Sequence, residues 1–337
     1  MDSRARVLNL LRSNPRGLRQ ADIARALGLS RSRVSEIVRE LERAGLVRRV
    51  REGSIELVVP VDRGARGPRE LSRQVRLGIV WSSEYPFIAV FAKLLRDRIG
   101  ADLQVVVYSN GLDATWDLIG GRIDLVLSPL VTQALFYSLT SALRIIGGGA
   151  AGGASVFYNP RGVPGVTSST RASTMDLCIS RAFKELGYGE SVRLYQARGS
   201  DIVHSIELGR AQLVAVWEPL ATRLRMEGFR EVATCLELGI VHCCTLAAPS
   251  DMEWEELKRL AMLYQEAINT FARNPEPWIE WYSARVGIEA SAVRKALSSY
   301  VYVPYVDVEG AVKMLRDAGV SVPSPTVLRE AVLEVAR

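Results

Sequence analysis

The sequence predicts a small, mostly helical unit followed by a larger α/β unit. The chain has 337 residues, of which 48% are hydrophobic and 24% are charged, a composition typical of globular proteins. Its length is sufficient for about two or three domains. Residues 1–76 contain 18 arginines against nine acidic residues, so they carry nine excess positive charges, whereas the remainder carries −3 because the whole chain is at +6. Apolar residues recur at helical spacing before residue 45, and strands alternate with helices after residue 75.

Three short helices are predicted in the basic unit. Apolar residues within 7–11 form the first stripe, which ends at an Asn-Pro-Arg-Gly turn. Residues 19–27 form the second helix, and a Gly-Leu-Ser turn follows in which Ser30 can cap the next helix. The third helix spans residues 31–44, with Gly45 as the terminating glycine. This order of two helices, a tight turn and a third helix is that of a helix-turn-helix.

The third helix and the two strands after it carry the candidate DNA contacts. Strands are predicted at residues 46–51 and 54–59, joined at Glu52-Gly53. A basic hairpin after such helices predicts a winged helix-turn-helix, whose third helix enters the major groove of DNA while the hairpin touches the backbone. The residues expected at the groove are Arg31, Ser32, Arg33, Ser35, Glu36 and Arg39, and those expected at phosphates are Arg48, Arg49 and Arg51.

Residues 20–35, with the sequence QADIARALGLSRSRVS, resemble the MarR and Lrp-type winged helices of bacterial and archaeal regulators. The resemblance covers roughly the first 60 residues and implies binding to double-stranded DNA. A homodimer is also expected, because one short recognition helix reads few bases and a second half-site supplies the rest. The alternative interpretation is a winged helix used for contact with another protein.

A linker at residues 61–74 separates the basic unit, residues 1–60, from the larger unit, residues 75–337. Strands are predicted at residues 75–81, 103–108 and 123–127, with helices at residues 87–95 and 112–119. This alternation predicts a mostly parallel sheet with helices on its faces. Ligands bind beyond the carboxyl ends of strands in such sheets, which makes residues 82–85 and Ser128 cleft candidates.

Three stretches of the larger unit, at residues 165–174, 182–188 and 205–219, resemble the type II periplasmic-binding-protein fold, in the branch of nitrate, sulfonate and thiamine-precursor receptors. The resemblance implies a ligand between two lobes, with lobe one made of residues 75–155 and 247–337 and lobe two made of residues 156–246. It places residues 168–171 at a helix start, where unpaired N–H groups and the helix dipole favour an anion, although a surface role for Arg171 stays open. The implied lining is Ser82, Ser83, Glu84, Tyr85, Ser128, Ser168, Ser169, Thr170, Arg171, Trp217 and Glu218.

Other patterns have competing interpretations. Residues 147–152 match G-x-G-x-x-G, but β-like residues follow where a dinucleotide site requires a helix, so we favour a flexible crossover beside the cleft. His242, Cys243 and Cys244 imitate a metal or nucleophile cluster, although vicinal cysteines in an apolar strand are typical of packing. Four cysteines without C-x-x-C spacing predict neither a disulfide framework nor a zinc knuckle. The uncharged run at residues 125–143 contains several polar residues and is predicted as buried core.

These patterns together predict a cytoplasmic, ligand-responsive transcriptional regulator that is not an enzyme and has no cofactor or metal. Its expected partners are double-stranded DNA, a small-molecule effector and a second copy of the chain, and no membrane is expected. Two alternatives stay open. One is an enzyme on the same fold that acts on a small heterocyclic or anionic substrate. The other is a transport receptor, which the DNA-binding unit and the lack of a recognisable secretory signal disfavour.

Overall fold

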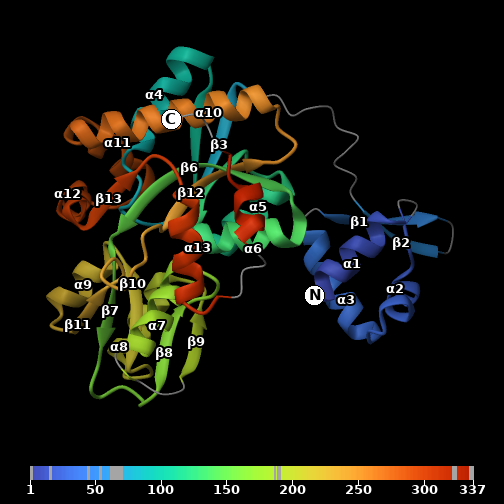
Figure 1. The fold of residues 1–337 in the computed structure, drawn as a ribbon, viewed down its shortest axis with the longest axis horizontal. Coiled ribbons are helices and arrows are strands. Elements are labelled where there is room, and N and C mark those ends of the chain that lie inside the picture. Colours follow the sequence, from blue (N-terminus) through green and yellow to red (C-terminus); the bar gives the residue numbers. More distant parts are fainter. Residues whose placement is uncertain are drawn as a thin grey trace.

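The computed structural model describes residues 3–14, 17–43, 46–52, 55–60, 71–185, 187, 191–320 and 325–333. Within these residues the chain forms an N-terminal part with three helices and a hairpin, and a larger part built on two sheets (Figure 1). None of the described helices is long and apolar enough to cross a membrane.

The N-terminal part has the predicted helix order followed by an antiparallel hairpin. Its elements are α1 (Ser3–Arg12), α2 (Gln20–Leu27), α3 (Arg31–Arg43), β1 (Val47–Glu52) and β2 (Ile55–Pro60). The Ser30 hydroxyl accepts a hydrogen bond from the Arg33 N–H at 3.2 Å, which confirms Ser30 as the cap of α3. Gly28 ends α2 at φ 66°, a left-handed conformation that glycine adopts without strain. The predicted roles of Gly45 and Gly53 lie outside the described residues.

The first of the two sheets in the larger part has six strands in the order β13-β6-β12-β5-β3-β4. Helices α4, α10 and α11 cover one face, while α5 and α6 pack on the other (Figure 1). The strands are β3 (Gln74–Val80), β4 (Asp102–Tyr108), β5 (Leu125–Pro129), β6 (Leu143–Gly152), β12 (Cys244–Pro249) and β13 (Tyr300–Val303). The helices are α4 (Ile88–Ile99), α5 (Gly111–Gly120), α6 (Leu130–Thr140), α10 (Trp254–Arg273), α11 (Glu276–Val286), α12 (Ala290–Ala296), α13 (Val308–Asp317) and α14 (Pro325–Ala331).

The prediction of a mostly parallel sheet is wrong. Only β4-β3-β5, the segment from which the prediction was made, is parallel. β12 runs antiparallel to both β5 and β6, and β6 runs antiparallel to β13. The long run from β5 through α6 is buried, as its composition predicts.

A second sheet has five strands in the order β11-β7-β10-β8-β9 and packs against α7, α8 and α9. Its elements are β7 (Ala154–Tyr158), β8 (Val166–Thr170), α7 (Thr174–Glu185), β9 (Val192–Gln196), α8 (Gly199–Glu207), β10 (Leu213–Trp217), α9 (Leu220–Met226) and β11 (Arg230–Thr234). The chain enters this sheet through Gly153, between β6 and β7, and returns to the first sheet between β11 and β12. Gly153 has φ 64°, and a Cβ there would lie 1.9 Å from the Tyr300 ring, so this crossing requires glycine.

The glycine-rich run at residues 147–152 lies inside β6, a largely buried strand, so the prediction of a flexible crossover is wrong. A Cβ on Gly148 would lie 2.1 Å from the Val303 carbonyl oxygen, and one on Gly149 would lie 2.2 Å from that of Cys244. The glycines therefore permit close approach of the neighbouring backbone. β7 follows where a dinucleotide-binding fingerprint requires a helix.

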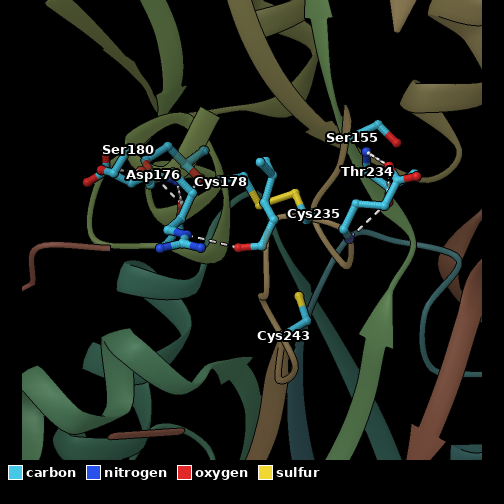
Figure 2. Close-up of a disulfide and its surroundings, with 12 residues drawn as sticks. Ser155, Asp176, Cys178, Ser180, Thr234, Cys235 and Cys243 are labelled. Atoms are coloured by element: carbon cyan, nitrogen blue, oxygen red, sulfur yellow. Dashed lines mark hydrogen bonds between the residues drawn. A yellow bond between two sulfur atoms is a disulfide. The ribbon is translucent and has the colours of Figure 1, made fainter. Parts of the chain in front are cut away.

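Cys178 in α7 and Cys235, just after β11, form a disulfide across 57 residues (Figure 2). The cysteine spacing predicted no disulfide framework, and it did not predict this single bond. Spacing alone could not reveal this pair, because the fold brings together two cysteines that are far apart in the sequence. The bond ties α7 to the segment that carries the chain back toward β12.

Candidate functional site

The polar face of α3 forms a surface depression in the N-terminal part. Val34, Ile37, Val38 and Leu41 are buried in the core, which turns the opposite face of the helix outward. Of the residues predicted at the groove, Arg31, Ser32, Glu36 and Arg39 are exposed, while Arg33 and Ser35 are partly exposed. The depression is lined by Ser30, Ser32, Arg33, Glu36, Arg39 and Glu40.

The basic residues of this part differ in how they are already paired. Arg33 forms an ion pair with Glu36 at 2.6 Å. Arg49 bridges two glutamates, at 3.1 Å and 3.0 Å, so it must exchange these surface pairs, worth about 0–1 kcal/mol each, to reach a phosphate. Arg48 is exposed on β1, and the side chain of Arg51 lies outside the described part. Of the two hairpin arginines whose side chains are described, Arg48 is therefore better presented to a polyanion than Arg49.

A cavity lies where strand ends of the two sheets meet in the larger part. Its empty volume, including the part open to solvent, is about 380 Å³. The first sheet contributes the loop after β3, the start of α5 and the start of β12, while the second contributes the ends of β8 and β10 and the start of α7. The lining is Val80, Ser82, Glu84, Tyr85, Asn110, Gly111, Pro129, Thr170, Ser173, Thr174, Met175, Trp217, Cys243 and Cys244.

Hydrogen bonds join the two halves of the larger part around this cavity. The Asn110 side chain donates to the Ala197 carbonyl at 3.2 Å, and the Thr132 hydroxyl donates to the Ala172 carbonyl at 2.7 Å. Ala172 has φ 50°, an unusual conformation for a residue other than glycine, next to the cavity wall. The Trp217 indole donates to the Trp81 carbonyl at 2.7 Å. A wider separation of the halves would break such bonds.

Five of the predicted ligand residues line the cavity: Ser82, Glu84, Tyr85, Thr170 and Trp217. The other six, Ser83, Ser128, Ser168, Ser169, Arg171 and Glu218, do not belong to its lining.

The predicted helix start is displaced by several residues. Residues 168–170 end strand β8, whereas α7 begins at Thr174, so their assignment to a helix start is wrong. The Ser173 hydroxyl accepts from the Asp176 N–H at 3.4 Å. The N–H groups of Asp176 and Leu177 also donate to the Ser173 carbonyl, so the N–H groups of Thr174 and Met175 are the ones at this end of α7 without an acceptor in the helix, and both residues line the cavity. Arg171 is exposed, and its guanidinium lies 4.9 Å from the centre of the Tyr195 ring. This position agrees with the surface role that the sequence left open for Arg171.

Glu218 and Ser128 are buried, and their side chains bond to other protein groups instead of facing the cavity. Glu218 pairs with Arg225 at 2.6 Å and accepts from the Thr222 N–H at 3.0 Å. The Ser128 hydroxyl lies 2.9 Å from the Thr115 hydroxyl and accepts from the Gln133 amide at 3.0 Å. Both residues therefore stabilise the structure next to the cavity without lining it.

Sequence reasoning missed Cys243 and Cys244 as cavity residues, although their adjacency was the available signal. The Cys243 sulfur lies 3.5 Å from a Glu84 carboxyl oxygen and 3.8 Å from the Cys244 sulfur, and the Tyr85 hydroxyl donates to Cys244 at 3.0 Å. His242 is apart from this cluster, because its Nε2 accepts from the Asp307 N–H at 3.2 Å.

Burial dominates the electrostatics of the cluster. It raises the pKa of Glu84 well above its ordinary value, since the charged carboxylate is poorly solvated there. The pKa of the Cys244 thiol is raised for the same reason, whereas a hydrogen bond with Cys244 lowers the pKa of the Cys243 thiol. Burial thus disfavours the charged forms of Glu84 and Cys244, whereas the hydrogen bond from its neighbour favours the charged form of Cys243.

Residues 2–54 match the model of the MarR family, so the N-terminal part is a MarR-family helix-turn-helix domain. The HTH-type transcriptional regulator Rv1719 of Mycobacterium tuberculosis is 34% identical over 109 residues, which cover 30% of this chain and 36% of that protein. The chain thus spans little more than a third of this curated relative.

The larger part has the fold of periplasmic binding proteins. The ligand-binding component of an ABC-type import system from Staphylococcus aureus, described with zinc bound, superimposes with TM-score 0.65 and 14% identity over 77% of this chain and 99% of that one. The periplasmic aliphatic sulphonate binding protein of Escherichia coli gives TM-score 0.63 and 16% identity over 79% and 94%. The periplasmic nitrate-binding protein of Synechocystis PCC 6803 gives TM-score 0.61 and 12% identity over 79% and 87%. These comparisons confirm the predicted two-lobed fold.

Proposed function

We propose that this chain is a DNA-binding transcriptional regulator whose affinity for DNA responds to a small molecule held between the two lobes. The observation that carries the proposal is the joining, in one chain, of a MarR-family helix-turn-helix to a binding-protein fold with a cavity at its strand ends. The DNA-binding unit is assigned to residues 1–60, the linker to residues 61–74 and the sensor to residues 75–337. A homodimer on double-stranded DNA inside the cell completes the proposal.

The DNA assignment is tested with fragments selected by the purified protein from a genomic library and measured by fluorescence anisotropy at several salt concentrations. Arg48→Ala should lower the slope of log affinity against log salt by about one, because one phosphate contact is lost. Arg33→Ala should cost about 1–3 kcal/mol at a single base position.

Arg96→Ala is the matched control, since it removes the same charge from an exposed position on α4 in the sensor. Salt slopes that are equal in all three variants and the parent would contradict the proposed interface. Light scattering and the spacing of footprints test the dimer, and a monomer on a single half-site would contradict it.

The cavity sets the chemistry expected of the effector. The N–H groups at the start of α7 favour an acceptor or anionic group near Thr174, while Tyr85 and Trp217 supply aromatic walls. We therefore expect a small effector with an accepting group and a flat or apolar portion.

Mass spectrometry of denatured protein identifies a co-purified molecule, and a thermal-shift screen of sulfonates, carboxylates, nitrate and pyrimidines tests the class. At 100 times its dissociation constant, an effector should stabilise the fold by about 2.7 kcal/mol. Thr170→Val should reduce this gain, whereas Ser169→Ala should not, because Thr170 lines the cavity and its neighbour does not. Equal gains in both variants would place the ligand elsewhere, and turnover of the molecule would indicate an enzyme.

A further inference from the structure

The cluster of Glu84, Cys243 and Cys244 contains a buried carboxyl group that is paired with no basic side chain among the described residues. Glu84 is 3% exposed, and its Oε1 has no hydrogen-bond partner among the described residues. In this part of the chain, no Lys, Arg or His forms an ion pair or hydrogen bond with Glu84, whereas the equally buried Glu218 is paired with Arg225. A buried polar group without a partner is costly, and here the open oxygen belongs to a residue of the cavity wall.

The distances in this cluster match those of a tetrahedral metal centre. Two thiolates bound to zinc at about 2.3 Å with a tetrahedral angle lie about 3.8 Å apart, and a thiolate and a carboxylate oxygen lie about 3.5 Å apart. The sulfur–sulfur distance between Cys243 and Cys244 is 3.8 Å, and the distance from the Cys243 sulfur to Glu84 Oε2 is 3.5 Å. All three ligand atoms lie within 4.8 Å of one another.

We infer that Glu84, Cys243 and Cys244 bind one thiophilic divalent cation of the zinc class, with a fourth position open toward the cavity. Two sulfur ligands and one oxygen ligand favour such a cation over magnesium or calcium, which require oxygen ligands alone. Both cysteines are free thiols, and Figure 2 shows Cys243 as a side chain separate from the Cys178–Cys235 disulfide. The hydroxyl of Tyr85, which donates to the Cys244 sulfur, is a positioning group for that ligand.

Zinc and cobalt are the probes, added to the full chain after treatment with a chelator and under exclusion of oxygen. We expect uptake of one ion per chain, and with cobalt a thiolate-to-metal charge-transfer band in the near ultraviolet. Absence of stoichiometric uptake, or a cobalt complex without this band, would overturn the inference. Because this measurement uses the unaltered protein, it does not depend on the folding of any variant.

Variants then assign the ligands. Cys243→Ser and Cys244→Ser should each remove the one-to-one uptake, and Glu84→Gln should weaken it by more than about 100-fold, which exceeds the effect of losing an outer partner. Tyr85→Phe should weaken it about 10–100-fold. His242→Gln is the matched control from the same segment and should bind as the parent does, since His242 accepts from a backbone N–H instead. Cysteine variants that bind zinc like the parent, or a histidine variant that loses it, would refute this ligand set.

The inference deepens the proposed function by placing a metal in the sensor cavity, but the two fail separately. Metal uptake is measured without DNA, so its absence leaves the DNA-binding proposal intact. Conversely, uptake by a protein that selects no DNA fragments would retain the metal site and refute the regulator.

Discussion

Arg225 is predicted to contribute more to the stability of the second lobe than any ordinary surface arginine. Its guanidinium binds Glu218 at 2.6 Å, Glu231 at 2.8 Å and the Ser155 hydroxyl at 3.1 Å. The Glu218 side chain is 1% exposed, whereas that of Arg225 is 35% exposed. Arg225 also lowers the pKa of Glu231 through its hydrogen bonds. Removing the arginine would therefore leave a buried carboxylate without its cation.

Arg225→Met tests this while keeping an apolar stem against Phe157, whose ring centre lies 5.9 Å from the guanidinium carbon. Loss of one partner from a buried ion pair costs about 3–5 kcal/mol. We expect about 3 kcal/mol, at the lower end of that range, because water already reaches the Arg225 side. Glu218→Gln should cost less, since Arg225 keeps Glu231. The double variant should cost less than the two single changes together.

The assay is urea unfolding followed by tryptophan fluorescence, which reports the larger part because all six tryptophans lie between residues 81 and 281. Arg223→Met is the matched control: Arg223 lies in the same helix and pairs with Glu207 and Glu227, whose side chains are 23% and 35% exposed. We expect the control to cost at most about 1 kcal/mol. Equal losses for Arg223→Met and Arg225→Met, or strictly additive losses in the cycle, would refute the reasoning.

Three further predictions concern packing, pH and the disulfide. Gly148→Ala should destabilise the larger part by about 1–3 kcal/mol because its Cβ would lie 2.1 Å from a carbonyl oxygen of β13, whereas Gly310→Ala meets only a side-chain tip and should be nearly neutral in the same urea assay. Burial lowers the pKa of His242, so its contribution to stability is present above about pH 6.5, the unperturbed value, and is lost as the pH falls toward the lower folded-state pKa. The free energy of unfolding should therefore decrease between pH 7.5 and pH 5, and His242→Gln should make this decrease smaller. Replacing Cys178 and Cys235 together by alanine should cost about 2–4 kcal/mol, and equal stability of the oxidised parent and this variant would contradict a structural role.

Local patterns predicted the local elements because the interactions that form them are close in sequence. Ser30 caps α3, as predicted, through a bond to a backbone N–H three residues away. The antiparallel half of the six-stranded sheet had no such signal, since β12 pairs with β6 across about a hundred residues. The same limit hid the Cys178–Cys235 disulfide, whose partners meet only after α7 and β11 are in place.

The sequence predicted where the cavity lies more accurately than it predicted which residues line it. Ser82, Glu84 and Tyr85 follow the end of a strand, and the rule that ligands bind at such ends placed them correctly at the cavity wall. Cys243 and Cys244 belong to the segment that returns from the second sheet, and their proximity to Glu84 depends on the pairing of β12 with β5. Adjacency in sequence singled out the two cysteines, which were interpreted as packing, and only the fold brings Glu84 close to them.

The positions of these residues indicate how a metal and an effector could act together. Glu84, Cys243 and Cys244 all come from segments of the first sheet, so a cation bound by them alone makes similar contacts whether the lobes are near or apart. A ligand changes a conformational equilibrium only through different affinities for the two states. A molecule that occupies the open metal position and also accepts hydrogen bonds from the start of α7 would bind both lobes and favour the closed one. If both proposals hold, zinc alone should leave DNA affinity nearly unchanged, while zinc together with the effector should change it.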